Sequence, residues 1–303
     1  MNKPIEHIKG IIPAIFTPFS ENGKPNLRIL HKYLAYLIDA GCDGFFVSGA
    51  NGECFLQSNE ERSQFTEAVV KELDGAKPVI FHVGAINPQD AYFLAMKAKK
   101  LKVDAISSVI PFYYGYSVME IAEYYKKLIQ LSERPLIVYY APENTGVKIS
   151  NNEFIDNIVN LPGVAGIKYT YSDIYQLQIL ANGKKGAGLK TYGGFDQMGI
   201  SFLSMGSNGL IGATFNLIPE VYVKMYACFQ AGNIKKAMQY QKIANEFSVQ
   251  IKKYTKSSYK AFIALRGINV GKPRACWTAA SAKDIGILGK MLENVLQEIK
   301  SAE

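Results

Sequence analysis

The stretch PVIFHVGAINPQDAYFLAMKAKKL, residues 78–101, shows the unit from which the fold is built. It begins with a short, mostly apolar run, which is typical of a strand buried on both faces of a parallel sheet. A polar loop follows, and Asn87 and Pro88 then supply a helix N-cap and the proline favoured in a first helical turn. The stretch therefore predicts a strand, a loop and a helix in that order.

The same unit recurs along the chain. The strand candidates, with their first residues, are IIPAIF (Ile11), GFFVS (Gly44), PVIFHV (Pro78), DAISSVI (Asp104), PLIVYY (Pro135), VAGIKYT (Val164), LKTYGG (Leu189) and GLIGAT (Gly209). Capping boxes of the form S-x-x-E are expected to start helices at Ser58, Ser117 and Ser150. Residues 27–40 are expected to form a helix whose apolar stripe comprises Leu27, Leu30, Leu34, Leu37 and Ile38.

Strands that alternate with helices in this way predict an α/β fold, a (β/α)8 barrel. A doubly wound sheet is the alternative, and it is disfavoured because no G-x-G-x-x-G follows the first strand. Strand signals stop near residue 218, and the remaining chain has a helical pattern apart from a turn near Gly271 and Pro273. We therefore expect a single domain over residues 1–303, with the barrel in 1–218 and C-terminal helices in 219–303 packed on it.

The composition excludes several classes of protein. With 48% hydrophobic and 20% charged residues among 303, the chain can bury a large core, unlike a disordered protein. The net charge of +8 comes without any nucleic-acid-binding motif, so no nucleic-acid partner is expected. The longest uncharged stretch, 197–219, is broken by glycines and is a poor membrane span. Four distant cysteines and a start without an apolar leader predict reduced thiols and a cytoplasmic location.

The carboxyl ends of the strands carry the chemistry in a barrel of this type. They give the candidates Ser48 to Glu53, Tyr113, Tyr114, Tyr139, Lys168, Thr170, Gly194, Asp196 and Thr214. Lys168 is unusual because it interrupts an apolar strand, where an unpaired ammonium is costly to bury. Desolvation there favours the neutral amine that attacks a carbonyl to form a Schiff base. The alternative is that Lys168 reaches solvent or pairs with Asp173.

Two further features fit amine catalysis. A phenol at Tyr139 can transfer protons beside such a lysine, although a core aromatic is the default for any one of 19 tyrosines. The turn GANGE, residues 49–53, offers consecutive backbone N–H groups to an anion. The three histidines form no pattern of metal ligands or of a catalytic triad, so a mechanism without metal is expected.

Several collinear segments resemble a known family. They are IIPAIFTPF from Ile11, SGANGE from Ser48, PFYYGYS from Pro111, VYYAPENTG from Val138, GIKYTYSD from Gly166 and ALRGINVGKPRA ending at Ala275. With them, the chain resembles the dihydrodipicolinate synthase/N-acetylneuraminate lyase family of class I aldolases. The resemblance implies a homotetramer of barrels with no cofactor and with pyruvate held as an imine on Lys168. It also implies proton transfer by Tyr139, a relay role for Tyr113 and a pyruvate carboxylate site in the turn after the second strand.

Within the family, the chain is most similar to the sialic acid lyases. Asn144 stands where the synthase branch has an arginine that binds the carboxylate of its aldehyde substrate. Ala50 and Asn51 replace two hydroxyl residues, Gln197 replaces a glutamate, and Ala213 replaces a serine but precedes Thr214. The implied substrate-binding residues are Ala50, Asn51, Thr170, Gly194, Asp196, Gln197, Ala213 and Thr214.

The expected function is cleavage of a 2-keto-3-deoxy sugar acid, N-acetylneuraminate first, into pyruvate and an aldehyde. One alternative is an aldolase acting on 2-keto-3-deoxygluconate, and another is a synthase-like enzyme. A barrel that binds a keto acid without turnover is the reading from a different class, because Ala50 lacks the relay hydroxyl. The expected partner is therefore a small keto acid.

Overall fold

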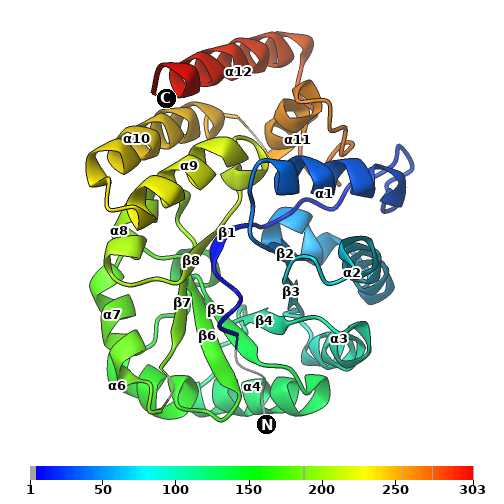
Figure 1. The fold of residues 1–303 in the computed structure, drawn as a ribbon. Helices are drawn as coiled ribbons and strands as arrows, with labels where there is room; N and C mark the ends of the chain where they lie inside the picture. Colours follow the sequence, from blue (N-terminus) through cyan, green and yellow to red (C-terminus); the bar gives the residue numbers. More distant parts are fainter. Residues whose placement is uncertain (1–4, 187, 255, 275, 303) are drawn as a thin grey trace.

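Each predicted apolar run forms a short parallel strand in the computed structural model, which describes residues 5–186, 188–254, 256–274 and 276–302 (Figure 1). Ala275 lies outside the described residues. The strands are β1 (Gly10–Pro13), β2 (Phe45–Val47), β3 (Val79–His82), β4 (Ala105–Val109), β5 (Leu136–Tyr140), β6 (Val164–Tyr169), β7 (Lys190–Gly193) and β8 (Gly209–Gly212). Their order in the sheet is β1-β8-β7-β6-β5-β4-β3-β2, and a parallel bridge between Ala14 and Phe46 nearly closes the ring. The predicted (β/α)8 barrel is confirmed.

Helices follow the strands and surround the ring (Figure 1). The α-helices are α1 (Leu30–Asp39), α2 (Asn59–Leu73), α3 (Pro88–Leu101), α4 (Val118–Ser132), α5 (Pro142–Thr145), α6 (Asn151–Phe154), α7 (Ile174–Gly183), α8 (Gly199–Ser204), α9 (Pro219–Gln230), α10 (Ile234–Ile251), α11 (Lys256–Leu265) and α12 (Ala282–Ala302). Short turns of other helix types are η1 (Leu27–Ile29), η2 (Ala50–Gly52), η3 (Cys54–Leu56), η4 (Ile155–Val159), η5 (Asp196–Met198) and η6 (Thr214–Asn216).

The expected helix starts are all confirmed, but one of the three expected capping boxes does not form. Capping boxes form at Ser58 and Ser117, and the Asn87 side chain accepts from the Gln89 N–H at the start of α3. No capping box forms at Ser150, whose hydroxyl donates to the Glu153 carboxylate at 2.5 Å. Helix α6 begins directly after Ser150, is one turn long and passes into the π-helical segment η4.

The helix expected over residues 27–40 starts as a 3-10 turn. Asn26 accepts from the Arg28 N–H at 3.2 Å and caps η1, and α1 begins only at Leu30. Leu30, Leu34 and Leu37 are buried as expected, whereas Leu27 is 44% exposed and Ile38 is partly buried. Leu27 lies in the 3-10 turn η1, before the α-helix that carries the buried stripe begins.

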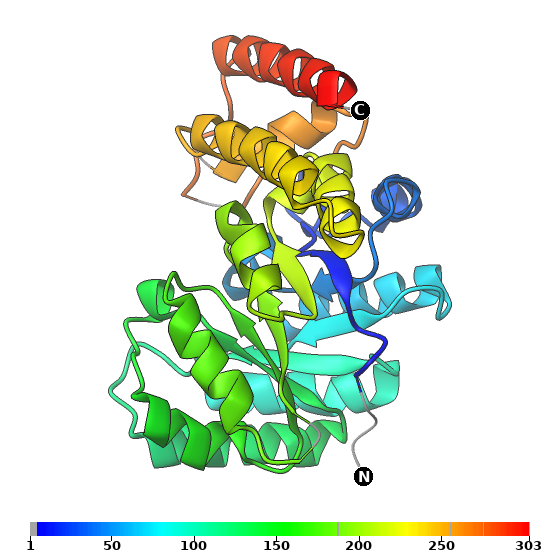
Figure 2. The same ribbon diagram turned by 60° about the vertical axis from the view of Figure 1, so that its left-hand side comes forward.

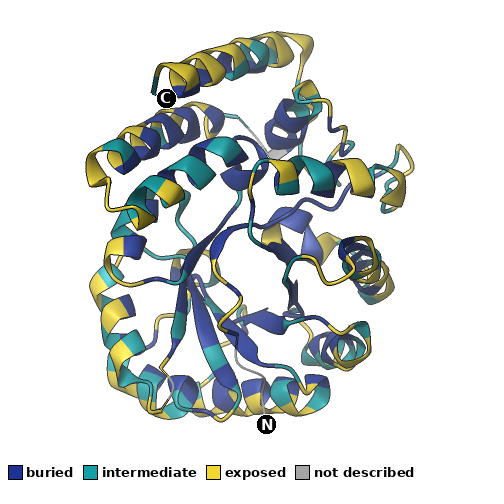
Figure 3. Ribbon diagram, in the orientation of Figure 1, coloured by how far each residue is buried: buried dark blue, intermediate teal, exposed yellow. Residues whose placement is uncertain are grey.

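The interior of the ring is apolar. Its buried residues are Ile5, Ile8, Ile12, Ala14, Phe46, Ile80, Ala105, Ile137, Tyr192 and Ile211. Ile5 and Ile8 belong to the arm that precedes β1, so the arm adds to this core on the side where the strands begin (Figure 2). In Figure 3 the strands are mostly buried and the surrounding helices expose their outer faces. The polar side chains at the other end of the strands therefore stand on a packed apolar floor.

The C-terminal helices stack on one another beside the barrel. Helix α9 packs against α10, and both α10 and α11 pack against α12, which lies outermost in Figures 1 and 2. Leu288, Met291, Val295 and Ile299 are the buried side of α12. The helical pattern expected after residue 218 is confirmed in the described residues, and the single domain over residues 1–303 stays a prediction. Among the described helices, none has both the length and the apolar character needed to cross a membrane.

Candidate active site

A cavity of about 430 Å³ opens at the carboxyl ends of the strands. Its lining residues are Ala14, Ala50, Asn51, Cys54, Phe55, His82, Val109, Phe112, Tyr139, Ala141, Asn144, Thr145, Lys168, Thr170, Gly194, Asp196, Ile211 and Ala213. The volume is within the range of small-molecule sites, and a few polar groups converge in a mainly apolar wall. The cavity brings together most of the site residues predicted from the sequence.

Lys168 reaches this cavity from β6. It is paired in register with Tyr139 of β5, and it is only 5% exposed. The ammonium Nζ lies 3.9 Å from the ring centroid of Tyr139 and 4.0 Å from that of Phe46. Ring faces attract a cation, so the two aromatic rings help to hold Lys168 in place. The side chain of Asp173, the alternative partner, accepts from the Gln176 N–H at 2.9 Å and caps α7.

Tyr139 is a partly buried phenol beside that lysine. Burial raises its pKa to about 12, against the opposing effect of the neighbouring Thr170 hydroxyl. Its ring meets Phe46 edge to face, with 6.1 Å between the centroids. At neutral pH the phenol is therefore protonated and ready to donate.

The turn after β2 contributes Ala50 and Asn51 to the cavity lining. Ala50 lies exposed at the start of η2, and Asn51 is buried, with its Nδ2 donating to the Ala14 carbonyl at 2.7 Å. Two non-glycine residues with positive φ bracket the turn, Ser48 at 56° and Glu53 at 61°. Non-glycine residues rarely adopt this left-handed backbone conformation. Where they do, the position is often part of a functional site.

Asp196 and Thr214 form a fixed unit near the far wall. The Asp196 Oδ2 accepts from the Thr214 N–H at 2.8 Å and from its hydroxyl at 2.6 Å. Burial raises the pKa of Asp196, and these two bonds oppose the rise. Gly194 leaves room for Thr170, because a Cβ at position 194 would lie 2.1 Å from the Thr170 Oγ1.

Tyr113, Gln197 and Thr214, which the resemblance implies at the site, do not line the cavity, and neither do the strand-end candidates Ser48, Gly49, Gly52, Glu53 and Tyr114. The Thr214 hydroxyl donates to Asp196 at 2.6 Å, and the Gln197 backbone carbonyl accepts from Asn245 at 3.2 Å. Tyr113 is 82% exposed, with a φ of 83°, and its ring packs against Tyr114 rather than beside Lys168. A relay through Tyr113 is therefore not assembled by the described residues of one chain.

His82 is the main cavity residue that the sequence analysis left without a role. Its Nδ1–H donates to the Ser48 carbonyl at 3.2 Å, and its Nε2 accepts from the Val109 N–H at 3.2 Å. Burial first, and then the nearby Arg62 and Lys168 charges, hold the pKa of His82 well below its usual range. The imidazole is therefore neutral. His82 is the last residue of β3, a strand from which the sequence analysis took no site residue. A polar side chain at that strand end is the signal that could have identified it.

No metal centre is visible in the described part of the chain, where no three His, Cys, Asp or Glu side chains gather to bind an ion. Cys42, Cys54, Cys228 and Cys276 are free thiols. Cys54 lines the cavity, and burial raises the pKa of its thiol. The polar groups available for chemistry in the cavity are therefore an amine, a phenol, a neutral imidazole, amides, hydroxyls and one carboxylate.

Comparisons with known proteins give a consistent result. An N-acetylneuraminate lyase of Rhizobium meliloti is 32% identical over 290 residues, which cover 95% of this chain and 96% of that protein. An N-acetylneuraminate lyase of Citrobacter koseri is 35% identical over 240 residues, 79% of this chain and 80% of that protein. The structure of wild-type Ruminococcus gnavus sialic acid aldolase is similar, with a TM-score of 0.92, 27% identity and coverage of 98% of this chain and 100% of that one.

The family assignment rests on nearly the whole chain. The model of the dihydrodipicolinate synthetase family matches residues 7–294, which include every strand of the barrel and most of α12. The chain therefore belongs to the dihydrodipicolinate synthetase family.

Proposed function

We propose that this chain is a class I aldolase that cleaves a 2-keto-3-deoxy sugar acid into pyruvate and an aldehyde through an imine on Lys168. The observation that carries the proposal is the buried Lys168 amine, which ends in the cavity against Tyr139. Burial of an ammonium is costly, and packing alone gives no reason for a lysine at this place. The phenol beside it supplies the proton transfer that the reaction needs.

The chemistry follows from these two side chains. The Lys168 amine adds to the keto carbon, water leaves, and the iminium becomes an electron sink. Tyr139 takes the proton from the aldol hydroxyl, and the adjacent carbon–carbon bond breaks. The electron pair of that bond forms the enamine as the iminium nitrogen becomes neutral. The aldehyde leaves, the enamine carbon is protonated, and water frees pyruvate from Lys168.

Tyr139 must act as both acid and base in this sequence. Its pKa of about 12 keeps the resting phenol protonated, so it donates while the imine forms. The iminium then places a positive charge beside the ring, which favours the phenoxide that accepts the hydroxyl proton. The turn at Ala50 and Asn51 is the proposed site of the pyruvate carboxylate, with backbone N–H groups and the Asn51 amide as donors.

The substrate that we propose is N-acetylneuraminate, cleaved to pyruvate and N-acetylmannosamine. The relatives named above act as N-acetylneuraminate lyases or a sialic acid aldolase. A synthase that binds an aldehyde with a second carboxylate is disfavoured, because Asn144 lines the cavity and no arginine does so among the described residues. Cleavage of 2-keto-3-deoxygluconate remains the alternative activity.

Two measurements test the function. Borohydride with pyruvate is expected to add a stable mass to Lys168, and labelling of another lysine with Lys168 untouched contradicts the mechanism. A product assay across keto-sugar acids, N-acetylneuraminate and 2-keto-3-deoxygluconate included, then identifies the substrate. Trapping on Lys168 without turnover of any acid favours a keto-acid-binding barrel.

The assembly is proposed to be a cytoplasmic homotetramer that needs no cofactor. The exposed apolar side chains of Tyr113, Tyr114 and Met119, which are 82%, 63% and 72% exposed, support contact between subunits. Light scattering of the purified protein measures the number of subunits, and a monomer contradicts this part of the proposal.

A further inference from the structure

A buried ion pair lies behind the turn that follows β2. The Lys260 Nζ of α11 lies 2.6 Å from the Glu53 Oε1, and the two side chains are 3% and 4% exposed. The same ammonium donates to the Thr17 carbonyl at 3.0 Å and lies 4.2 Å from the ring centroid of Phe19. Neither Lys260 nor Glu53 lines the catalytic cavity. The proposed chemistry therefore makes no direct use of this pair.

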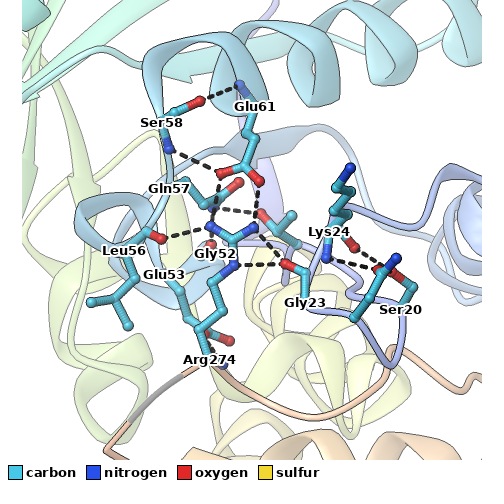
Figure 4. A network of polar contacts seen from close by, with 12 residues as sticks. Ser20, Gly23, Lys24, Gly52, Glu53, Leu56, Gln57, Ser58, Glu61 and Arg274 are labelled. Carbon is cyan, nitrogen blue, oxygen red and sulfur yellow. Dashed lines mark hydrogen bonds and ion pairs between the residues drawn. The ribbon is translucent and has the colours of Figure 1, made fainter.

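Arg274 binds the same segment from a second point (Figure 4). Its backbone N–H donates to the Glu53 Oε2 at 2.7 Å, so each carboxylate oxygen of Glu53 has a partner from the C-terminal part of the chain. Its guanidinium donates to the Leu56 carbonyl at 2.6 Å and to both carboxylate oxygens of Glu61. Arg274 thus reaches from Glu53 to the first turn of α2.

These contacts hold one of the two residues with positive φ that bracket the turn. Glu53 has a φ of 61°, and its N–H donates to the Ala50 carbonyl at 3.1 Å, which closes the turn over Asn51 and Gly52. A glutamate in the left-handed region persists only when its surroundings hold it there. Because Lys260 and Arg274 occupy both carboxylate oxygens, they fix the side chain and through it the backbone.

We propose that Lys260 is a positioning residue, which through Glu53 sets the geometry of the turn that binds the pyruvate carboxylate. The inference rests on the function proposed above and extends it to a helix of the C-terminal extension. It gives Arg274 a supporting part, since its backbone N–H holds the other oxygen of Glu53. The C-terminal helices then contribute to substrate binding as well as to stability.

The variants must separate positioning from stability. Lys260→Met keeps the unbranched stem but leaves the Glu53 carboxylate buried without its cation, which destabilises the fold. The double variant Lys260→Met with Glu53→Gln removes both charges and so avoids a buried unpaired carboxylate. Arg266→Met is the matched control, because Arg266, directly after α11, pairs with Glu220 at 2.7 Å and packs on the Tyr36 ring rather than on the turn.

The experiment measures the rate of borohydride trapping on Lys168 against pyruvate concentration, together with the thermal unfolding midpoint. Lys260→Met and the double variant are expected to need about tenfold more pyruvate for the half-maximal rate, since small displacements of a binding group are costly. The rate at saturating pyruvate changes by less than about threefold, because Lys168 and Tyr139 are on other strands. The double variant regains unfolding temperature relative to Lys260→Met but keeps the weak pyruvate dependence.

Two results overturn the inference. One is an unchanged half-saturating pyruvate concentration in the double variant, which leaves the pair with a structural role only. The other is an equal shift in Arg266→Met, which makes the effect a general consequence of lost stability. Failure of the wild-type chain to trap pyruvate on Lys168 is a different result, which contradicts the proposed function itself and this inference with it.

Discussion

Among the residues whose burial the structure describes, two lysines are buried, one in a barrel strand and one in a C-terminal helix, and their surroundings differ. Lys168 is 5% exposed and lies against the ring faces of Tyr139 and Phe46 at an open cavity. Lys260 is 3% exposed and lies against the carboxylate of Glu53 and a backbone carbonyl, away from that cavity. Burial of a lysine is thus not by itself a sign of chemistry. Access to the catalytic cavity distinguishes Lys168, the proposed nucleophile, from Lys260, the proposed positioning residue.

The largest expected effect is on Lys168. Lys168→Ala removes the amine, so pyruvate trapping and turnover are expected to disappear while the barrel stays folded. Mass spectrometry after borohydride and a thermal melt measure both. A variant that still turns over substrate contradicts the role of Lys168.

Lys260→Met is expected to lower the stability of the fold rather than to abolish pyruvate trapping. Breaking a buried ion pair by removing one partner costs about 3–5 kcal/mol of unfolding free energy, because the Glu53 charge is left buried. Urea unfolding compares it with Lys168→Met, which makes the same chemical change at the other buried lysine. Equal losses of unfolding free energy in the two variants would show that Lys260 and Lys168 contribute to stability in the same way.

Tyr139→Phe separates proton transfer from imine formation beside Lys168. Loss of a general acid–base group lowers turnover by about a hundredfold or more, while trapping of pyruvate on Lys168 persists. The phenylalanine keeps the ring face that Lys168 contacts, so the geometry of the pair is retained. Steady-state kinetics together with trapping measure the two effects, and near-normal turnover would return Tyr139 to the role of a core aromatic.

The sequence predicted Lys168 but not Lys260, for a physical reason. A lysine inside an apolar strand breaks the local hydrophobic pattern, so the segment VAGIKYT indicates an unusual role for Lys168. Lys260 stands in a helix, KSSYKAFIAL, where lysine is an ordinary residue. Its partner Glu53 is more than two hundred residues earlier, and no local pattern reports such a contact. The eight strands were predictable because each carries its own short apolar run.

The same limit explains the remaining differences at the site. Local pattern placed Tyr113 among the strand ends, yet the backbone at a φ of 83° leaves its side chain 82% exposed. His82 was passed over because one histidine in an apolar run looks like a core residue. Only the tertiary structure shows that its ring lies 6.0 Å from that of Tyr139.

The turn held by Glu53 gives a smaller effect. Asn51→Ala is expected to weaken pyruvate binding by about 1.5–3 kcal/mol, the range for a hydrogen bond to a charged group. Ala50→Ser is the matched change at the next position, and it is expected to leave binding unchanged and to raise turnover if a relay hydroxyl is lacking. Pyruvate affinity and turnover are measured for both. Unchanged pyruvate affinity in Asn51→Ala would show that the pyruvate carboxylate binds elsewhere. Unchanged turnover in Ala50→Ser would favour proton transfer by water.

The smallest effect is expected at Glu61, which pairs with Arg274. Arg274 also holds Glu53, the partner of Lys260. The Arg274 guanidinium hydrogen-bonds to Glu61 and holds the pKa of that carboxyl below its ordinary value of 4.5. The unfolded chain therefore binds the proton more readily than the native one does. The stabilisation is complete above that ordinary value and is lost as the pH falls through the lowered native pKa.

The side chain of Glu61 is 25% exposed, so solvent limits the contribution to about 1 kcal/mol or less. Urea unfolding of the wild type and of Glu61→Gln between neutral and acid pH measures it. The two free energies are expected to differ most at neutral pH and to converge in acid, since a protonated Glu61 carries no more charge than the glutamine. A difference that grows as the pH falls would show that the carboxylate is repelled rather than attracted in the native state. A constant difference would show that Arg274 gains nothing from the charge and binds Glu61 only as a hydrogen-bond acceptor.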